Sequence, residues 1–295
     1  MILLSKQGLT NVESIEMTRN KSFDNSTPIL YLIATPIGNL KEMSPRALEI
    51  IQEADIIAAE DTRNAFSLLA NFGIKKELFS LREHNEKEAS QNLLEKIKNG
   101  KKVAYMSDAG YPGISDPGYL LVQEMIKNNI AVSTISGSSA FLNALVASGL
   151  DTKHFYFHGF LPAKEGEAKE ELINLKNKSE TLIFYEAPHR IDKTLALLYD
   201  VLGDRFVCLA RELTKLNEEY IRGPLGELIK LEPSTIKGEI VLIVEGNKEE
   251  KAVNDDELKA RVAYFINLGL SQKDAINVVS EEFKINKNHI KKLVF

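Results

Sequence analysis

The residues best suited to chemistry lie in short loops, and the densest of these loops is Ser107–Gly118. Its sequence, SDAGYPGISDPG, contains three Gly, two Pro, two Asp and two Ser, and it follows the apolar run Val103–Met106. Glycine and proline hold the chain in turns and leave backbone N–H and C=O groups open to a ligand. The loop therefore predicts a ligand site, although a long surface turn would have a similar composition.

Two further loops follow apolar runs and consist of small or turn-forming residues. In Ala34–Leu40 (ATPIGNL), Pro36 and Gly38 favour a tight turn that lets the backbone approach a ligand. Ser136–Ser139 precedes an apolar helical pattern, so its small residues allow close backbone approach or an anion at the helix N-terminus. An ordinary helix cap would explain this second loop equally well.

Charged side chains of both signs occur together in Glu60–Arg63 (EDTR), Glu186–Arg190 (EAPHR) and Arg211–Lys215 (RELTK). Carboxylates and imidazoles can accept protons in catalysis, and arginine binds phosphate well. Each segment also has a structural interpretation: Asp61 or Thr62 can cap a helix, and the other two segments can form ion pairs at a domain interface. The residues alone leave both interpretations open.

Residue counts exclude several common sites. No two of the 17 glycines are separated by a single residue, so the dinucleotide fingerprint G-x-G-x-x-G is absent, as are the P-loop and nucleophile-elbow motifs. The single cysteine, Cys208, excludes a disulfide or a thiolate cluster within one chain. No third ligand accompanies His154 and His158, and we expect no metal site.

The charge balance excludes a general polyanion binder but leaves one basic segment. Lys and Arg total 37 and Asp and Glu total 42 in 295 residues, a net charge of −5. Phe283–Phe295 nevertheless contains four lysines and no acidic residue, which predicts a phosphate-contacting arm or else a solvated helix face. The four are Lys284, Lys287, Lys291 and Lys292.

Composition also bounds the compartment and the number of domains. No apolar run reaches the roughly 20 residues that cross a bilayer, and we expect no secretory signal near the N-terminus. With one cysteine, a reducing, cytoplasmic location without a membrane partner is favoured. The length predicts about two domains with room for a small third.

The loops stand at the ends of β-rich runs that alternate with helical patterns. Strands are expected at Leu30–Ala34, Ile56–Ala59, Val103–Met106 and Ala131–Ile135. This alternation predicts a parallel sheet covered by helices, with ligands at the carboxyl ends of its strands.

A second α/β domain with a mixed sheet is expected from further runs at Phe155–Phe160, Leu182–Tyr185, Phe206–Ala210 and Ile240–Val244. After a polar linker, Asn247–Glu257, the sequence is helical, and Ser271 is placed to cap one of its helices. The predicted parts are a lead-in at 1–28, α/β domains at 29–150 and 151–247, and a helical domain at 255–295.

Six motifs occur in a characteristic order: LYLIATPIGNL, AAEDTR, SDAGYPGISDPG, FYEAPHR, ARELTK and GEIVLIVEG. In this order they resemble the bacterial 16S rRNA 2′-O-ribose cytidine methyltransferases of the tetrapyrrole-methylase superfamily, from about Ile29 to the C-terminus. The resemblance implies that S-adenosylmethionine is the methyl donor and is held between the two α/β domains. It also implies a decoding-centre cytidine ribose of the small ribosomal subunit as acceptor, and a homodimer by analogy.

The resemblance further implies which positions bind the donor. Relatives usually have Thr, a larger apolar residue and Pro where this chain has Tyr111, Gly113 and Ser136. The implied donor-binding residues are Pro36, Gly38, Ser107, Asp108, Ala109, Gly110, Ile114, Ser115, Ser136, Gly137, Ser138, Tyr185, Glu186 and Ala210.

A ribose hydroxyl is a poor nucleophile at neutral pH, so a base should assist the transfer. The candidates are Glu60, Asp61, Glu186 and His189, and we favour the Glu186/His189 pair on the substrate side, with Arg190 or Arg211 binding phosphate. A site without a dedicated base is the alternative mechanism. The alternative functions are methylation of a small molecule such as a tetrapyrrole and a non-catalytic role in ribosome assembly.

Overall fold

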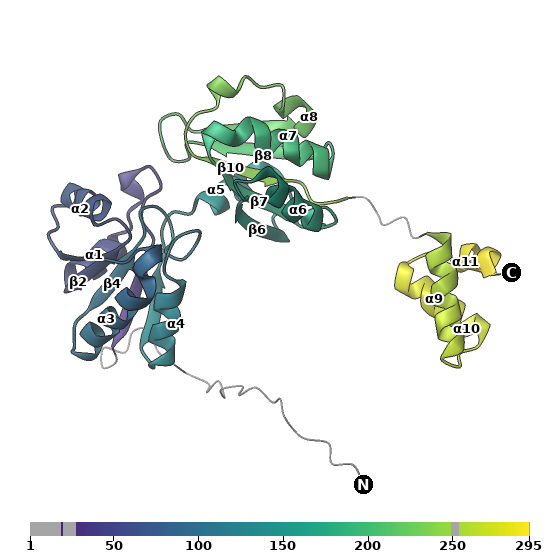
Figure 1. Ribbon diagram of the computed structural model, residues 1–295, viewed down its shortest axis with the longest axis horizontal. Helices are drawn as coiled ribbons and strands as arrows, with labels where there is room; N and C mark the ends of the chain where they lie inside the picture. The colour runs from purple at the N-terminus through teal and green to yellow at the C-terminus, as the bar shows by residue number, and fades with distance from the viewer. Residues whose placement is uncertain (1–18, 20–27, 249–253, 295) are drawn as a thin grey trace, which may run out of the picture. The chain divides into compact units, whose positions relative to one another are not determined.

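The computed structural model describes Arg19, residues 28–248 and residues 254–294. Most of the predicted lead-in at 1–28 and the middle of the predicted linker lie outside the described residues. By packing, the chain divides into two units, Met1–Gly246 and Asn247–Phe295. The first unit contains the two α/β domains, coloured from purple to green in Figure 1, and the second contains the C-terminal helices.

The first sheet is parallel throughout, as the alternation of strands and helices predicts, with strand order β3-β2-β4-β1-β5. The sequence predicts four of its strands but not the edge strand β3, because the sequence of β3, ELFS, is only partly buried and contains no apolar run. The five strands are β1 (Ile29–Ile33), β2 (Ile56–Ala59), β3 (Glu77–Ser80), β4 (Val103–Met106) and β5 (Ala131–Ile135).

Both faces of this sheet are covered by helices, so its central strands are apolar on both sides. Successive side chains alternate between faces: Val103 and Tyr105 pack toward α3 and α4, whereas Ala104 and Met106 pack toward α1 and α2. Ser44 caps α1, since its hydroxyl accepts a hydrogen bond from Ala47 N. The helices are α1 (Pro45–Glu53), α2 (Thr62–Asn71), α3 (Glu86–Lys98) and α4 (Tyr119–Lys127).

The second sheet is mixed, as predicted: β6 and β7 pair in parallel and the other strands are antiparallel, in the order β6-β7-β10-β8-β9. One face carries α6 (Glu165–Leu175), α7 (Ile191–Leu202) and the short α8 (Leu225–Leu228). The strands are β6 (Phe155–Phe160), β7 (Thr181–Glu186), β8 (Phe206–Arg211), β9 (Glu219–Pro224) and β10 (Ile240–Val244). Short 3-10 helices occur at Leu40–Glu42, Glu83–Asn85, Pro188–Arg190 and Pro233–Thr235.

Helix α5 (Ala140–Ser148) packs on the other face of the second sheet, not on the first. Its Ala144 and Leu145 lie in one cluster with Ile183, Cys208 and Val241. The predicted boundary at residue 150 therefore assigns this helix to the wrong sheet, because an apolar helix between two sheets can cover either. By crossing early, the chain brings the loop before α5 to the place where the two domains meet.

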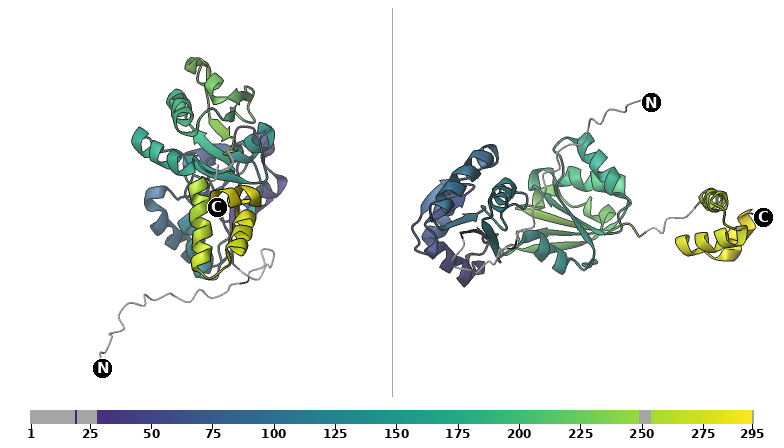
Figure 2. Two further views of the ribbon diagram at one scale, coloured as in Figure 1. Left: turned by 90° about the vertical axis from the view of Figure 1, so that its right-hand side faces the viewer. Right: turned by 90° about the horizontal axis from the view of Figure 1, so that it is seen from below.

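The C-terminal unit consists of α9 (Asp255–Asn267), α10 (Gln272–Phe283) and α11 (Lys287–Val294), yellow in Figure 2, around a small apolar core. The Ser271 cap is confirmed, because its hydroxyl accepts a hydrogen bond from Asp274 N at 3.2 Å. The predicted linker extends too far, since α9 begins at Asp255 with three acidic residues in its first turn. Among the residues described, none of the helices has the length and apolar character to cross a membrane.

Candidate active site

A cavity of about 730 Å³ lies where the strand-end loops of the first domain meet α5 and the second sheet. This volume falls within the usual range for a small-molecule site. Three groups of side chains line it: Ile37, Ala109–Tyr111 and Ile114–Asp116 from the first domain; Ser139–Leu142 around the start of α5; and Phe160, Tyr185–Pro188, Glu212, Lys215 and Gly238–Val241 from the second domain.

The first-domain wall is fixed by hydrogen bonds between two of the predicted loops. Thr35 N donates to Gly110 O at 2.9 Å, and Gly110 N donates back to Thr35 O at 3.1 Å. Gly110 has a φ of +75°, which favours glycine. Close packing also requires Gly137, because a Cβ there would lie 2.8 Å from Ala34 O. The backbone that faces the cavity is therefore preorganised by its own residues.

Tyr111 joins the long loop to the loop before α5. Its phenolic oxygen accepts a hydrogen bond from Gly137 N at 3.2 Å. The family resemblance implies a threonine at this position, so the contact depends on the residue in which this chain departs from the implied pattern. The tyrosine side chain thus lines the cavity and connects the long loop to the loop before α5.

The far end of the long loop Ser107–Gly118 is held by Glu86, a residue that no sequence pattern singles out. This glutamate is buried, and its Oε1 accepts hydrogen bonds from Gly118 N and Leu120 N, each at 2.8 Å. It thereby satisfies free N–H groups in the first turn of α4. Tyr105 also reaches the loop, donating from its hydroxyl to Pro117 O at 2.8 Å.

Six of the implied donor-binding residues line the cavity, and the others lie beside it or behind its walls. Gly38 packs against the second domain, where a Cβ would come within 2.6 Å of Lys215 Cγ, and Ser138 Oγ donates to Glu42 Oε2 at 2.6 Å. The six lining residues are Ala109, Gly110, Ile114, Ser115, Tyr185 and Glu186. The remaining residues, outside the lining, are Pro36, Ser107, Asp108, Ser136, Gly137 and Ala210.

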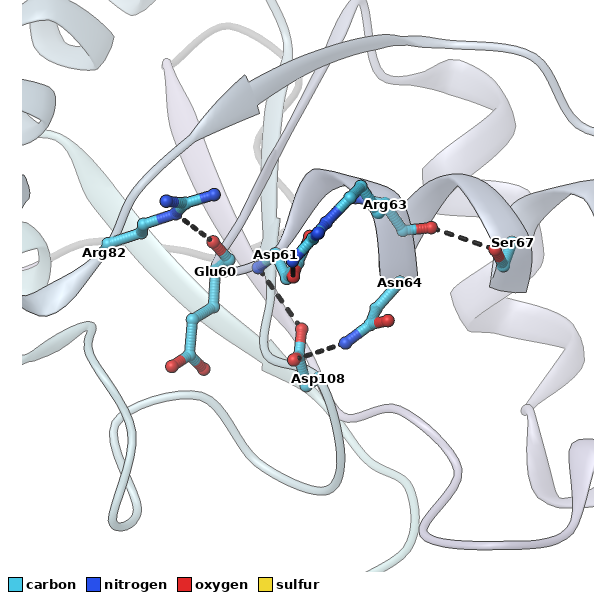
Figure 3. A network of polar contacts seen from close by, with 7 residues as sticks. All are labelled: Glu60, Asp61, Arg63, Asn64, Ser67, Arg82 and Asp108. Atoms are coloured by element: carbon cyan, nitrogen blue, oxygen red, sulfur yellow. Dashed lines mark hydrogen bonds and ion pairs between the residues drawn. The ribbon is translucent and has the colours of Figure 1, made fainter.

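Asp61 forms a helix cap and an ion pair, as its structural interpretation predicts. Its Oδ1 accepts from Arg63 N at 2.9 Å, and its carboxylate pairs with the Arg63 guanidinium (Figure 3). Hydrogen bonds from Arg63 hold the pKa of Asp61 well below its usual range. Asp108 joins the same network by accepting from Asp61 N at 3.3 Å and from Asn64 Nδ2 at 2.7 Å. Asp61 is therefore poorly placed to accept a proton.

Glu186 lines the cavity, but its carboxylate is already fully engaged. It accepts from Thr194 Oγ1 at 2.5 Å and from Ala187 N at 2.7 Å, and it pairs with Arg190 Nε at 2.6 Å. His189 is exposed and is absent from the cavity lining, so the two members of the favoured pair do not face the cavity together. The geometry gives Glu186 a positioning role.

The two arginines proposed to bind phosphate are engaged within the second domain. The Arg190 guanidinium also donates to Leu161 O at 2.8 Å, and Arg211 pairs through Nε with Glu219 Oε2 at 2.5 Å. Both charges are therefore largely neutralised by neighbouring carboxylates. The charged cavity residues Glu212 and Glu239 are likewise paired, each with Lys215 Nζ, at 2.9 and 3.1 Å.

Asp116 is one of the lining residues that the sequence-based assignment missed. Burial, followed by the nearby Glu60 and Asp108 carboxylates, raises its pKa from 3.8 to about 6, with a hydrogen bond from Ser107 partly opposing this rise. Burial raises the pKa of Glu60 as well, and its carboxylate extends away from Arg82 and Arg63 (Figure 3). The order of strands in the sheet could have pointed to Asp116. Acidic residues follow β2 and β4, and the ends of adjacent parallel strands lie together.

The predicted basic arm and the predicted lack of a metal site involve other parts of the chain. All four lysines of the arm are exposed, and none forms an ion pair within the described residues.

His158, one of the two histidines considered for a metal site, pairs with Glu171 Oε2 at 2.8 Å. Over residues 28–248 and 254–294, no three His, Cys, Asp or Glu side chains are grouped so as to hold a metal ion.

Comparison with known proteins places this chain in a family. The profile of the tetrapyrrole (corrin/porphyrin) methylases matches residues 29–229. A ribosomal RNA small subunit methyltransferase I from Halalkalibacterium halodurans is 45% identical over 88% of this chain and 92% of its own length. The protein of that name from Escherichia coli O157:H7 is 42% identical over 94% of this chain and 98% of its own length.

Solved structures support the fold alone. The methyltransferase CobJ matches with a TM-score of 0.57 and 17% identity, over 75% of this chain and 95% of its own. Diphthine synthase matches with a TM-score of 0.57 and 14% identity, over 74% of this chain and 89% of its own. The chain is thus a methyltransferase that belongs to the tetrapyrrole methylase family and, within it, to the group of the ribosomal RNA small subunit methyltransferases I.

Proposed function

We propose that this protein transfers a methyl group from S-adenosylmethionine to the ribose 2′-oxygen of a cytidine in the decoding centre of 16S rRNA. The observation that carries the proposal is a cavity built by strand-end loops of both α/β domains. Relatives at 42–45% identity are named small subunit rRNA methyltransferases, which supports an rRNA acceptor. The choice of the 2′-oxygen and of cytidine rests on the family resemblance of the motifs.

The lining of the cavity fits the donor. Bound S-adenosylmethionine supplies a methyl group on a positively charged sulfur, which needs alignment and exclusion of water rather than further activation. Ala109 and Gly110 line one wall, and the aromatic residue Tyr185 lines another. Since Thr35, Tyr111 and Gly137 fix the first wall, little ordering is required when the donor binds.

The rim of the cavity fits a nucleoside. Phe160 lines it with 56% of its surface exposed, and its ring centroid lies 5.5 Å from that of Tyr185. A β-bulge at Phe157/Gly159 interrupts the register of β6 with β7 directly before Phe160, and bulges near active sites commonly re-aim a side chain. An exposed aromatic face is a stacking surface for an unpaired base.

The C-terminal helices supply the proposed contact with the phosphate backbone. Each exposed lysine of the basic arm can neutralise one phosphate and release a counterion. We further propose that the assembled small subunit in the cytoplasm is the substrate and that the enzyme is a homodimer. Exposed apolar side chains on α5, chiefly Val146 at 72%, support an additional protein contact.

Incubation with radiolabelled S-adenosylmethionine and small ribosomal subunits that lack the modification tests the proposal. We expect label in the 16S rRNA and none when the subunits carry the modification beforehand. Binding of the donor without transfer to subunits would instead indicate a small-molecule acceptor or a non-catalytic role in assembly.

A further inference from the structure

We infer that the carboxylate of Asp116 accepts the proton of the hydroxyl that is methylated. This inference rests on the proposed methyl transfer. It names a different residue from the bases suggested by the sequence, and it follows from the position of Asp116 in the cavity and from the contacts of its competitors.

Four carboxylates line the cavity: Asp116, Glu186, Glu212 and Glu239. Glu186 is paired with Arg190, and the other two glutamates share Lys215. A carboxylate that is paired with a cation is a weak base, because its protonation would leave the charge of that cation unneutralised. Within the described residues Asp116 has no ion pair, so it is the lining carboxylate best able to take up a proton.

Asp116 lies at the seam between the two domains, where donor and acceptor must meet. Its neighbour Ser115 approaches β6 so closely that a Cβ on Gly159 would lie 3.3 Å from Ser115 Oγ. Phe160, the proposed stacking residue, is the next residue of that strand and also lines the cavity. A base stacked on Phe160 would therefore carry its ribose to the side of the cavity that contains Asp116.

The loop around Asp116 is rigid, as a positioned base requires. Ser115 adopts a φ of +60°, which is uncommon for a residue other than glycine. On the other side, Pro117 O accepts hydrogen bonds from Gly113 N at 3.1 Å and from Tyr105 Oη at 2.8 Å. Such a conformation persists only when surrounding contacts maintain it, and it is common at active sites.

The groups that face Asp116 bring its pKa closer to neutral pH. Burial, followed by the charged neighbours Glu60 after β2 and Asp108 after β4, raises the pKa of Asp116 to about 6, and a hydrogen bond from Ser107 partly opposes this rise. The phenols of Tyr105 and Tyr185 also lie near enough to respond to its charge. A base with a pKa close to the working pH is ionised yet still basic enough to be effective.

The step balances without another reactant. The ribose oxygen forms a bond to the methyl carbon while the carbon–sulfur bond breaks, and that electron pair remains on sulfur as a neutral thioether. The hydroxyl proton passes to a carboxylate oxygen of Asp116, which later releases it to water. No oxidant or reductant is involved.

Single-turnover methylation of unmodified small subunits by wild type and Asp116→Asn, measured between pH 5 and pH 9, tests the inference. We expect wild type to show a rise in rate around pH 6, and we expect the variant to lack this rise and to lose about 100-fold or more in rate, the usual contribution of a general base. Affinity for S-adenosylmethionine, measured calorimetrically, should remain unchanged. A variant that keeps the wild-type rate and acidic limb would overturn the inference alone, whereas absence of transfer by wild type at every pH would overturn the proposed function with it.

Glu60→Gln provides a second test that leaves Asp116 in place. Loss of the neighbouring negative charge should lower the pKa of Asp116 and move the acidic limb to lower pH while transfer continues. Glu49→Gln is the matched control, since Glu49 is exposed on α1 and is absent from the charges that act on Asp116. An acidic limb that stays unmoved in Glu60→Gln, or moves equally in both variants, would contradict the inference.

Discussion

Asp116→Asn should stabilise the protein at neutral and alkaline pH. The pKa of Asp116 is raised from 3.8 to about 6, so the folded state holds the proton more tightly than the unfolded chain does. Any stability that this carboxyl contributes is therefore present at about pH 4 and below, and it is lost as the pH rises through about 6. Asparagine has a similar shape and cannot ionise, so the variant avoids that loss.

The size of the effect follows from the shift. About two pKa units correspond to about 3 kcal/mol, and solvent screening of a partly exposed carboxyl reduces this to about 1–2 kcal/mol. For a domain pair of this size, each kcal/mol changes Tm by about 2–4 °C. We expect the variant to melt about 2–8 °C above wild type at pH 8, and the difference to disappear toward pH 4.

Thermal unfolding followed by circular dichroism at several pH values measures this difference. Asp192→Asn is the matched control, because Asp192 is exposed in the first turn of α7 and favours the helix slightly. That control should melt at or slightly below the wild-type temperature. An Asp116→Asn variant that is less stable than wild type at pH 8, or whose advantage is independent of pH, would refute the reasoning.

Three further predictions concern the rest of the site. Glu186→Gln should lower the free energy of unfolding in urea by about 1–3 kcal/mol, because the buried Arg190 contact loses its charged partner; unchanged stability would show that this ion pair holds nothing in place. Phe160→Ala should raise the KM for small subunits about 5- to 100-fold, the value of one stacked base, without altering S-adenosylmethionine affinity; an unchanged KM would remove Phe160 from the acceptor site. Replacing the four lysines of the basic arm by glutamine should weaken binding to the small subunit, and the slope of log binding constant against log salt concentration should fall in magnitude by up to about 3. An unaltered slope would show that these lysines form a solvated helix face.

Much of the fold could be predicted because the buried strands are continuous apolar runs. Val103–Met106 and Ile240–Val244 have the predicted bounds, since both faces of each strand are covered. The edge strands β3 and β9 were not predicted, because partial exposure leaves no apolar run to detect. The position of α5 depends on which of two apolar sheet faces remains uncovered, and one sequence does not contain that information.

The candidate site was predictable to the level of loops but not of individual roles. Turn-forming residues after apolar strands identified the cavity walls, because that relation is local in the chain. Whether Glu186 is a free base or one half of an ion pair depends on Thr194 and Arg190 packing against it, which only the folded helix α7 and its preceding turn determine. The raised pKa of Asp116 arises from burial and then from Glu60, 56 residues earlier in the sequence, and it therefore appears only once β2 and β4 are known to be neighbours.

The chemical position of the transferred methyl group is the most informative quantity to measure. Small subunits methylated in vitro can be digested with alkali and with nucleases, and the products identified by mass spectrometry. A ribose 2′-O-methyl group blocks alkaline cleavage, so we predict one alkali-resistant dinucleotide that contains methylcytidine and maps to the decoding centre. A methyl group on a base, or on a nucleotide other than cytidine, would contradict the proposed function.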